Sequence, residues 1–455
     1  MKKSRPAIKL YLTHILYTLI WVLLFPFALG YLFLRGRKDR EYREHLAERF
    51  GSYQDLGMSS SVWIHAVSMG ETIAVAPLVR ALLAQGERVI ITHFTPAGRR
   101  TSQSLFAEDM ATGRLKAVYV PFEFDWVFSR FFKAFAPKYG LIVEADIWPR
   151  MISASRRRRV PLFLCNGLFS SRSVELDRKL FGIRSGVMRE LSGMMVKSSL
   201  HKDRFHAVGI KNIAVTGELR FDQPVPKHHL AAANELKASA GFANRKVIAL
   251  TSAVAEEEDL HFSYMKHMLE RVEDTETKPL FIYVPREPER FSGLTQSLNS
   301  YGLRACARSD WLDADLSEKE NLTLDDIEVI VGNSLGEMFF YLALSDMVVV
   351  GRSFHPRGSH NVIEPLLLGK PVVVGPYTWN IEYPSVEAIE AGVLTQCETI
   401  EELETFTLDF LADRWDALKF TNATRDFLQT HAGATEKCIA ALPILLNNVA
   451  PEGTS

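Results

Sequence analysis

The sequence predicts an α/β protein in which each half of the chain folds into a doubly wound parallel sheet. Short apolar runs that suit buried strands, each followed by a turn and a helix, recur at intervals of roughly 25 residues. The series stops at a stretch that contains two prolines, residues 217–226, and starts again at Val247. The chain has 455 residues, 47% of them hydrophobic, which is enough for two domains of roughly 200 residues, each with its own core.

The net charge and the cysteines exclude several classes of protein. A net charge of −1 does not suit a general polyanion binder, so we expect no nucleic-acid partner and only local charge-based targeting. The cysteines lie far apart and lack the spacing of metal ligands: Cys165, Cys306, Cys397 and Cys438. We therefore expect reduced, inert thiols and no metal site.

Residues 1–50 differ from the rest of the chain. Residues 10–34 contain one strongly polar side chain, His14, and this run of 25 residues exceeds the roughly 20 that a membrane-spanning helix needs. Basic residues follow the run densely: Arg35, Arg37, Lys38, Arg40 and Arg43. We expect an uncleaved membrane anchor, with the following chain in the cytoplasm beside an anionic membrane surface. A cleaved signal peptide is disfavoured because the apolar run is too long and is not followed by a small-residue cleavage site. A buried hydrophobic helix is the other alternative.

Apolar runs in the first half predict strands at 62–67, 88–92, 117–120, 139–143, 161–165, 195–197 and 213–216. Candidate site residues follow several of them: Ser68, Gly70 and Glu71, then Thr95, then Glu144 and Asp146, then Asn166 and residues 170–173. Because the carboxyl ends of parallel strands share one edge of a sheet, these residues predict a cleft. Glu71 follows a glycine at a strand-to-helix turn, where its carboxylate could act as a general base toward a hydroxyl. The structural alternative is a glutamate stabilised by the dipole of the helix at 72–85.

In the second half, strands are expected at 247–251, 281–284, 327–331, 347–350 and 372–374. The segment 358–376 predicts a loop, a short helix and a strand. Gly358 and Ser359 would form the turn, Asn361 would cap the helix together with Glu364, and Gly369 would end it. Such a turn exposes backbone N–H groups that bind phosphate, and Glu364 could accept hydrogen bonds from a ribose diol. The alternative is an ordinary loop–helix–strand unit.

Three further segments carry expectations. Arg286 lies between two prolines after a strand and could contact a phosphate or a carboxylate, with a surface arginine as the alternative. The arginine run at 156–159 is either a solvated helix end or a patch for phosphorylated lipid headgroups. Residues 308–320 are acidic on balance and are expected to be exposed, while residues 401–448 predict helices that return to pack on the first domain.

The order of the motifs resembles that of the 3-deoxy-D-manno-octulosonic acid (Kdo) transferases. The chain carries WIHAVSMGE at 63–71, ITHFTPAGR at 91–99, EADIWP at 144–149, GELRFD at 217–222, VPREPERF at 284–291, SLGEM at 334–338, and the long motif at 351–376. The resemblance covers essentially the whole chain. It implies a membrane-anchored bacterial glycosyltransferase of the GT-B fold, with two Rossmann-like domains facing a cleft.

The resemblance also implies a domain plan and a reaction. Residues 1–50 would be the membrane anchor and basic juxtamembrane helix, 51–222 the acceptor domain, 223–430 the nucleotide-sugar domain, and 431–455 a C-terminal helix and tail. The donor would be CMP-Kdo and the acceptor a lipid A precursor, in lipopolysaccharide biosynthesis at the cytoplasmic face of the inner membrane. Glu71 would be the general base of an inverting displacement, with no metal ion or other cofactor.

Carried over by position, the resemblance implies two sets of binding residues. The donor set is Pro285, Arg286, Gly336, Glu337, Ser353, Gly358, Ser359, Asn361 and Glu364. The acceptor set is Ser68, Gly70, Thr95, Glu144, Asp146, Arg172 and Arg220.

The chain departs from the family pattern mainly on the donor side. It has Ala253 and Val254 at the start of a usual His-Glu-Gly-Glu run, Glu287 for histidine, Asn333 for aspartate and Arg352 for a second glycine. It also has Glu218 and Arg220 where asparagine and lysine are common. Two alternatives follow: a paralogous GT-B glycosyltransferase with another donor or acceptor, and a catalytically silent membrane-associated homologue. An epimerase of the same fold is disfavoured by the anchor, because epimerase substrates are soluble.

Overall fold

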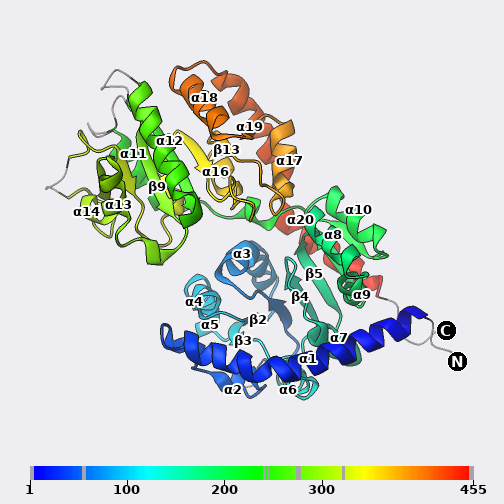
Figure 1. The fold of residues 1–455 in the computed structure, drawn as a ribbon. Helices are drawn as coiled ribbons and strands as arrows, with labels where there is room; N and C mark the ends of the chain where they lie inside the picture. The colour runs from blue at the N-terminus through cyan, green and yellow to red at the C-terminus, as the bar shows by residue number, and fades with distance from the viewer. Residues whose placement is uncertain are drawn as a thin grey trace. The chain divides into compact units, whose positions relative to one another are not determined.

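The computed structural model describes residues 5–53, 58–238, 242, 245–272, 278–319 and 323–449 (Figure 1). The chain divides into two compact units. Unit 1 comprises Met1–Gln223 and Ala432–Ser455, and unit 2 comprises Pro224–His431.

Unit 1 is built on a seven-stranded parallel sheet, as the recurring strand–turn–helix pattern predicts. The strand order is β3-β2-β1-β4-β5-β6-β7. The strands are β1 (Val62–His65), β2 (Val89–His93), β3 (Leu115–Tyr119), β4 (Tyr139–Val143), β5 (Leu162–Gly167), β6 (Gly193–Val196) and β7 (Ile213–Val215). The winding direction reverses between β1 and β4, which lie side by side at the centre of the sheet. In open α/β sheets, ligands bind at the carboxyl ends of strands at such a switch point.

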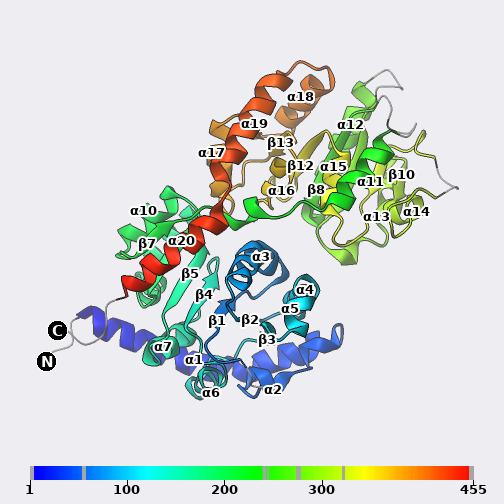
Figure 2. The same ribbon diagram turned by 180° about the vertical axis from the view of Figure 1, so that it is seen from behind.

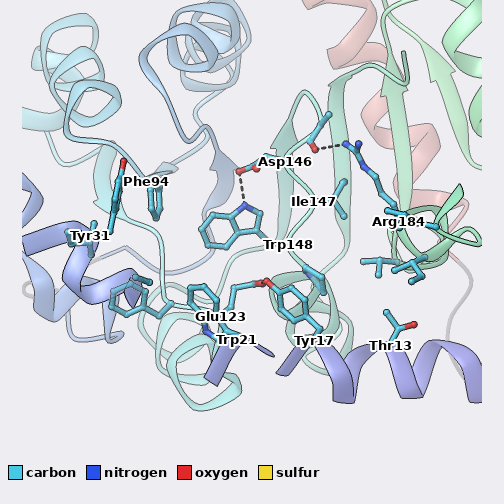
Figure 3. Close-up of a pocket in the computed structure, with 18 residues that line it drawn as sticks. Thr13, Tyr17, Trp21, Tyr31, Phe94, Glu123, Asp146, Ile147, Trp148 and Arg184 are labelled. Carbon is cyan, nitrogen blue, oxygen red and sulfur yellow. Dashed lines mark hydrogen bonds between the residues drawn. The ribbon is translucent and has the colours of Figure 1, made fainter. Parts of the chain in front are cut away.

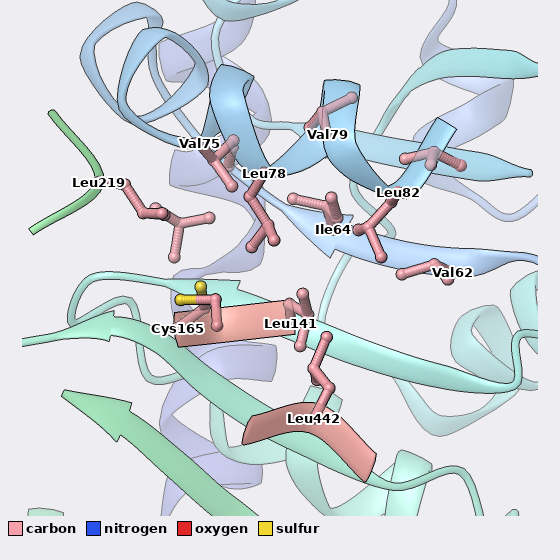
Figure 4. Close-up of a cluster of buried hydrophobic side chains, with 14 of the residues drawn as sticks. Val62, Ile64, Val75, Leu78, Val79, Leu82, Leu141, Cys165, Leu219 and Leu442 are labelled. Carbon is pink, nitrogen blue, oxygen red and sulfur yellow. The ribbon is translucent and has the colours of Figure 1, made fainter. Parts of the chain in front are cut away.

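Helices cover both faces of this sheet (Figure 2). They are α3 (Met69–Ala84), α4 (Pro96–Leu105), α5 (Ala107–Ala111), α6 (Asp125–Phe135), α7 (Pro149–Arg157), α8 (Ser171–Lys179), α9 (Ile183–Met188) and α10 (Ser199–Ala207). One face packs α3 against β1 and β4, where Val75, Leu78 and Leu82 meet Ile64 and Leu141 (Figure 4). This burial fixes the start of α3, and with it Glu71, relative to the ends of β1 and β4.

The last helix of the chain, α20 (Ala434–Asn447), belongs to the same core. Cys438 and Leu442 are buried in the cluster that α3 forms with the sheet. The 3₁₀ turn η2 (Leu219–Asp222) holds the start of α20, because the Asp222 carboxylate accepts hydrogen bonds from the backbone N–H groups of Gly433 at 2.8 Å and Thr435 at 2.5 Å. The expected return of residues 401–448 to the first half of the chain is confirmed for this last helix alone, because the helices Ile400–Leu411 and Ala417–His431 belong to unit 2.

Helix α1 (Arg5–Arg35) runs along the surface of unit 1 (Figure 1). Its inner side packs Trp21, Phe25 and Leu32 against Phe122 and Phe124. The short elements η1 (Arg40–Tyr42) and α2 (Leu46–Arg49) follow it.

The outer side of α1 is apolar and exposed. Leu23 is 72% exposed and Phe27 is 73% exposed. From Leu10 to Arg35 the helix is long and apolar enough to cross a membrane by length and composition. The alternative of a buried hydrophobic helix is wrong, because only one side of α1 is covered.

Unit 2 repeats the architecture with the strand order β10-β11-β9-β8-β12-β13-β14, all parallel. The strands are β8 (Val247–Ala253), β9 (Leu280–Pro285), β10 (Ala305–Ala307), β11 (Val329–Val331), β12 (Met347–Val350), β13 (Val372–Val374) and β14 (Leu394–Gln396). The helices are α11 (Lys227–Lys237), α12 (Glu258–Arg271), α13 (Leu294–Tyr301), α14 (Arg308–Trp311), α15 (Met338–Leu344), α16 (Ile363–Leu367), α17 (Glu382–Glu390), α18 (Ile400–Leu411) and α19 (Ala417–His431).

One local expectation in unit 2 is confirmed in part and another is wrong. The acidic side chains of residues 308–319 are exposed as expected, but the segment also buries Trp311 fully and Arg308, which is 5% exposed and pairs with Glu337; residue 320 lies outside the described residues. The capping box at Asn361 and Glu364 does not form. Helix α16 begins at Ile363, whose N–H donates to Asn361 Oδ1 at 3.0 Å, so Asn361 forms a turn before the helix instead.

Candidate functional site

In unit 1 the candidate base, Glu71, lies in the first turn of α3, just after the turn that follows β1. Ser68 is the N-cap of α3 and its Oγ accepts a hydrogen bond from the Glu71 N–H at 3.4 Å. Glu71 Oε2 in turn accepts one from the Val67 N–H at 2.7 Å. A Cβ added at Gly70 would meet nothing within 4 Å among the described residues, so this glycine leaves space beside the carboxylate. The turn therefore holds one oxygen of Glu71 and leaves its surroundings open on the Gly70 side.

The surroundings of Glu71 favour its protonated form. Burial, followed by the negative charges of Glu144 and Asp146, raises the pKa of Glu71 to about 8, against the opposing effects of the Val67 N–H and Arg220. A carboxylate with a pKa near the working pH is a stronger proton acceptor than an ordinary glutamate. A raised pKa of this kind would suit a general base. It could not be predicted from the sequence alone.

Glu144 belongs to a charge network at the end of β4. Its Oε1 lies 2.7 Å from Arg220 Nη1 and 3.7 Å from Lys197 Nζ. Lys197 also pairs with the buried Glu218 at 2.5 Å, and Asn166 Nδ2 donates to Glu218 Oε1 at 2.7 Å. Burial opposes ionisation of Glu144, but Arg220 and Lys197 outweigh it and hold the pKa of this carboxyl below its usual value. Glu144 is therefore an ionised neighbour of Glu71.

Lys197 was not among the residues singled out in the sequence. It follows β6 directly in a segment that reads as an ordinary apolar strand, and only its position beside Glu218 reveals its role. Glu218 stood out only as a departure from the family pattern.

Asp146 lies in a second group of contacts beside the same strand end. Its Oδ2 lies 3.3 Å from Nε2 of the buried His65 and accepts a hydrogen bond from Trp148 Nε1 at 2.8 Å. Nδ1 of His65 lies 2.9 Å from Thr92 Oγ1. His65 stands within an apolar strand motif, so sequence reasoning missed its contact with Asp146.

Two further residues of the expected acceptor set, Thr95 and Arg172, interact with neighbouring protein groups. Thr95 caps α4, accepting from the Gly98 N–H at 3.2 Å while its hydroxyl donates to the Val67 carbonyl at 3.1 Å. It therefore holds the turn that precedes Glu71. Arg172 lies exposed on the first turn of α8, where its charge acts on Glu175 of the same helix.

In unit 2 the expected donor residues gather at the carboxyl ends of four neighbouring strands, β11, β9, β8 and β12. Asn333, Gly336 and Glu337 follow β11. Pro285 ends β9, and Arg286 and the exposed Glu287 come next. Ala253 ends β8, with the buried Val254 after it, and Arg352, Ser353, Gly358, Ser359, Asn361 and Glu364 follow β12.

Positive charge is concentrated on the side of β9 and β12. Burial, followed by the charges of Arg352 and Arg286, lowers the pKa of His360 to about 3. Burial and the charges of Arg286 and Arg357 also lower the pKa of Arg352. Cations this close repel one another, and an anion placed among them would relieve the repulsion. These residues could bind a phosphate or a carboxylate.

The loop after β12 is held by contacts among its own residues and by Asn380, which follows β13. Arg352 has a φ of 62°, in the left-handed region, and its Nε donates to the Gly358 carbonyl at 2.6 Å. A Cβ at Gly358 would lie 2.2 Å from Asn380 Oδ1, and Asn380 Nδ2 donates to the Ser359 carbonyl at 2.6 Å. The hydroxyl of the buried Ser353 donates to the Val350 carbonyl at 2.6 Å.

Glu257, which sequence reasoning missed, holds the same loop from the start of α12. Its carboxylate accepts from the backbone N–H groups of Arg352 at 2.5 Å and Phe354 at 2.9 Å. It lies in the acidic run after β8, where three glutamates in a row look alike in the sequence.

On the other side of β9, Glu337 is occupied by protein contacts. Its Oε1 lies 2.8 Å from Arg308 Nη2, and its Oε2 accepts from the Ser334 hydroxyl at 2.6 Å. Asn333 accepts from the Ser309 N–H at 3.0 Å. These two residues anchor the loop after β11 to α14, and Gly336 forms its exposed tip with a φ of 83°.

Within the described ranges, no group of three or more His, Cys, Asp or Glu side chains is placed to hold a metal ion.

Comparison with known proteins identifies relatives of the whole chain. Residues 44–223 match the family model described as 3-deoxy-D-manno-octulosonic-acid transferase (kdotransferase). The 3-deoxy-D-manno-octulosonic acid transferase of Bordetella pertussis is 33% identical over 87% of this chain and 89% of its own length. The protein of the same name from Haemophilus influenzae is 26% identical over 95% of this chain and 99% of its own.

Among solved structures, UDP-GlcNAc 2-epimerase from Neisseria meningitidis, bound to UDP-GlcNAc, matches with a TM-score of 0.56. It is 13% identical, over 84% of this chain and all of that chain, so the likeness concerns the fold alone. With the two parallel sheets and the apolar N-terminal helix, it confirms the predicted fold class of two Rossmann-like domains of the GT-B type.

Proposed function

Because the chain belongs to the 3-deoxy-D-manno-octulosonic-acid transferase family and is a glycosyltransferase, we propose that it moves Kdo from CMP-Kdo to a lipid A precursor with inversion. The observation that carries the mechanism is the position of Glu71, whose pKa is raised to about 8 beside the strand ends at the switch point. Unit 1 would bind the acceptor, and unit 2 would bind the donor.

In the proposed reaction, Glu71 takes the proton of an acceptor hydroxyl as its oxygen attacks the anomeric carbon of Kdo. The new C–O bond forms as the bond to the phosphate of CMP breaks, and the phosphate keeps the electron pair. A single displacement inverts the configuration at that carbon. The ionised Glu144, held by Arg220, keeps Glu71 basic enough to receive the proton.

On the donor side, Arg286 and Arg352 would bind the phosphate or the Kdo carboxylate, and the backbone of 358–361 would approach the nucleotide. Glu364, in the first turn of α16, would accept hydrogen bonds from the ribose. Positive charge from arginine would stabilise the departing CMP, so the proposed mechanism uses no metal ion or other cofactor. Its rate should therefore be unchanged by a chelator.

We also propose that the enzyme works at the cytoplasmic face of the bacterial inner membrane. The exposed apolar side of α1 supports this placement, because a band of exposed Leu and Phe side chains is costly in water. The basic residues after α1 would face anionic headgroups.

A second candidate is a glycosyltransferase of the same fold with another donor. The observation that favours it is the exposed Glu287 directly after Arg286, because a carboxylate there weakens the attraction for a phosphate.

The test is CMP release and Kdo addition, followed by mass, with CMP-Kdo and a tetraacylated lipid A precursor in detergent. Wild type should add Kdo, and Glu71→Gln should lose most of the rate while binding CMP as wild type does. Glu87→Gln, which alters an exposed ion pair with Lys138, is the matched control. A folded wild type that binds CMP but adds no Kdo would favour the second candidate.

A further inference from the structure

Unit 1 contains a pocket of about 640 Å³ between α1 and the segments that follow β2, β3 and β4 (Figure 3). Its walls are mainly aromatic and aliphatic: Trp21 and Tyr31 from α1, Phe94, Trp148, and Ile183 and Val187 from α9. The volume lies within the range of roughly 300–1,000 Å³ that small-ligand pockets occupy.

Most polar groups in the walls have protein partners, although Nε1 of Trp21 is buried without a hydrogen bond among the described residues. The Tyr17 hydroxyl donates to Glu123, Trp148 Nε1 donates to Asp146 at 2.8 Å, and Arg184 Nη2 donates to the Ala145 carbonyl at 3.0 Å (Figure 3). A ligand therefore meets mostly hydrocarbon and aromatic surface, which suits an apolar chain better than a sugar or a nucleotide.

The pocket connects two features already described. One wall is α1, whose opposite side exposes Leu23 and Phe27. The other wall is the segment that begins at Ala145, directly after Glu144, and its Asp146 is one of the charges that act on Glu71. An apolar chain in this pocket would thus lie between the helix proposed to face the membrane and the neighbourhood of the candidate base.

We infer that this pocket takes one acyl chain of the lipid acceptor and so positions its sugar hydroxyl near Glu71. The inference rests on the proposed function, since it assigns a place to part of that acceptor. The acceptor's own chain is favoured over a bulk membrane lipid because the pocket wall continues into the charge network around Glu71.

Filling the pocket tests the inference. Ala28 lines the pocket from α1, so Ala28→Phe should fill it without removing a hydrogen bond. Leu23→Phe adds a ring on the exposed side of the same helix and is the matched control. Ile183→Trp fills the pocket from α9 and replaces Ala28→Phe should that variant fail to fold.

The readout is kcat/KM for a tetraacylated acceptor divided by kcat/KM for the same sugar phosphate without acyl chains. Ala28→Phe should lower this ratio at least tenfold, and Leu23→Phe should leave it unchanged. In wild type, kcat/KM should also decrease by about fourfold for each methylene removed from the bound chain, and less steeply in Ala28→Phe. An unchanged ratio in both pocket variants would overturn the inference.

A binding readout separates this inference from the proposed function. Trp21 and Trp148 line the pocket, so a tetradecanoic acid brominated at mid-chain should quench tryptophan fluorescence in wild type and Leu23→Phe and quench it less in Ala28→Phe. The acylated acceptor should displace this probe. Should wild type transfer no Kdo, the proposed function fails while the quenching still reports on the pocket. Equal quenching in all three proteins, or displacement by phospholipid but not by the acceptor, contradicts the inference.

Discussion

Arg220 joins Glu144 to the turn that carries Glu71. Its Nη1 lies 2.7 Å from Glu144 Oε1, and its Nη2 donates to the Gly70 carbonyl at 3.4 Å. One guanidinium thereby ties the end of β4 to the start of α3. It also places a positive charge near two carboxylates whose pKa values shift in opposite directions.

This relationship predicts opposite changes in the pH dependence of kcat/KM. In wild type, kcat/KM should rise with pH through the pKa of Glu71, about 8, because the base acts when deprotonated. Glu144→Gln removes a negative charge and should move this midpoint down by about one unit, whereas Arg220→Gln removes a positive charge and should move it up. Glu87→Gln should leave it unchanged. Shifts of the same sign in both variants would contradict the electrostatic account.

The raised pKa of Glu71 also predicts that this side chain destabilises the fold. The unfolded carboxyl ionises near about pH 4.3, while the folded one keeps its proton up to about pH 8, so ionisation favours the unfolded state across that window. Glu71→Gln should therefore be more stable than wild type at pH 8, by about 2 kcal/mol after allowance for partial exposure, and equally stable near pH 4. Urea unfolding at the two pH values measures the difference. A variant less stable than wild type at pH 8 would show that Glu71 is a structural residue.

Because Lys197 and Glu218 form a buried ion pair, replacing only one of them should lower the free energy of unfolding strongly. Lys197→Met leaves Glu218, which is 1% exposed, without its nearest cation, and should cost about 3 kcal/mol of unfolding free energy. The pKa of folded Glu218 lies below its usual value, chiefly because Lys197 outweighs the effect of burial. The stability that this pair supplies is present above about pH 4.3 and is lost as pH decreases through the lower folded pKa. The double variant Lys197→Met/Glu218→Met should recover much of the loss at pH 7.

Replacing Gly358 or Gly369 by alanine should lower the free energy of unfolding by different amounts. Gly358→Ala adds a Cβ that clashes with Asn380 Oδ1, at a backbone φ of 88°. The free energy of unfolding should decrease by about 1–2 kcal/mol because of the left-handed backbone and by about 1–3 kcal/mol more because of the clash. Gly369→Ala, at a φ of 66° with nothing within 4 Å among the described residues, should cost the backbone part alone. Thermal unfolding compares the two, and CMP titration should show weakened binding in Gly358→Ala. Equal stability of the two variants would show that the clash with Asn380 does not destabilise the fold.

The hydrogen bonds of Glu123 should help to hold α1 on the rest of unit 1. Its buried carboxylate accepts from the Tyr17 hydroxyl and from the backbone N–H groups of Arg150 at 2.9 Å and Met151 at 3.1 Å. Glu123→Ala removes all three contacts and should speed hydrogen exchange in α1 and in the first turn of α7. Glu87→Ala should change neither segment. Unchanged exchange in Glu123→Ala would show that aromatic packing alone holds the helix.

Much of the fold follows from local pattern, because strands buried on both faces of a parallel sheet must be apolar. Runs such as 139–143, 347–350 and 372–374 match their strands to the residue. The sequence does not predict the edge strands β10 and β14, because each has only three residues: ACA has small side chains and LTQ has mixed polarity. Trp311 was placed in an exposed segment because its acidic neighbours outnumber the apolar side chains that are buried.

The site was predicted as a set of strand ends rather than as a network. Parallel topology places Glu71 near Glu144, and the sequence contains that information once β1 and β4 are known to be neighbours. It does not contain the pairing of Lys197 with Glu218 or the hold of Glu257 on the loop after β12, because these contacts depend on side-chain direction across more than 20 residues of chain. The raised pKa of Glu71 depends on burial and on all these charges together.

The position of α20 in the core of unit 1 has a consequence for synthesis on the ribosome. Cys438 and Leu442 complete a core that begins with Val62, so unit 1 cannot close until nearly the whole chain has been made. Unit 2 is continuous from Pro224 to His431 and emerges before that final helix. Unit 2 should therefore fold while unit 1 still lacks its last helix and exposes apolar surface to chaperones. A stall or truncation after residue 431 would damage the half that carries Glu71 and spare the other.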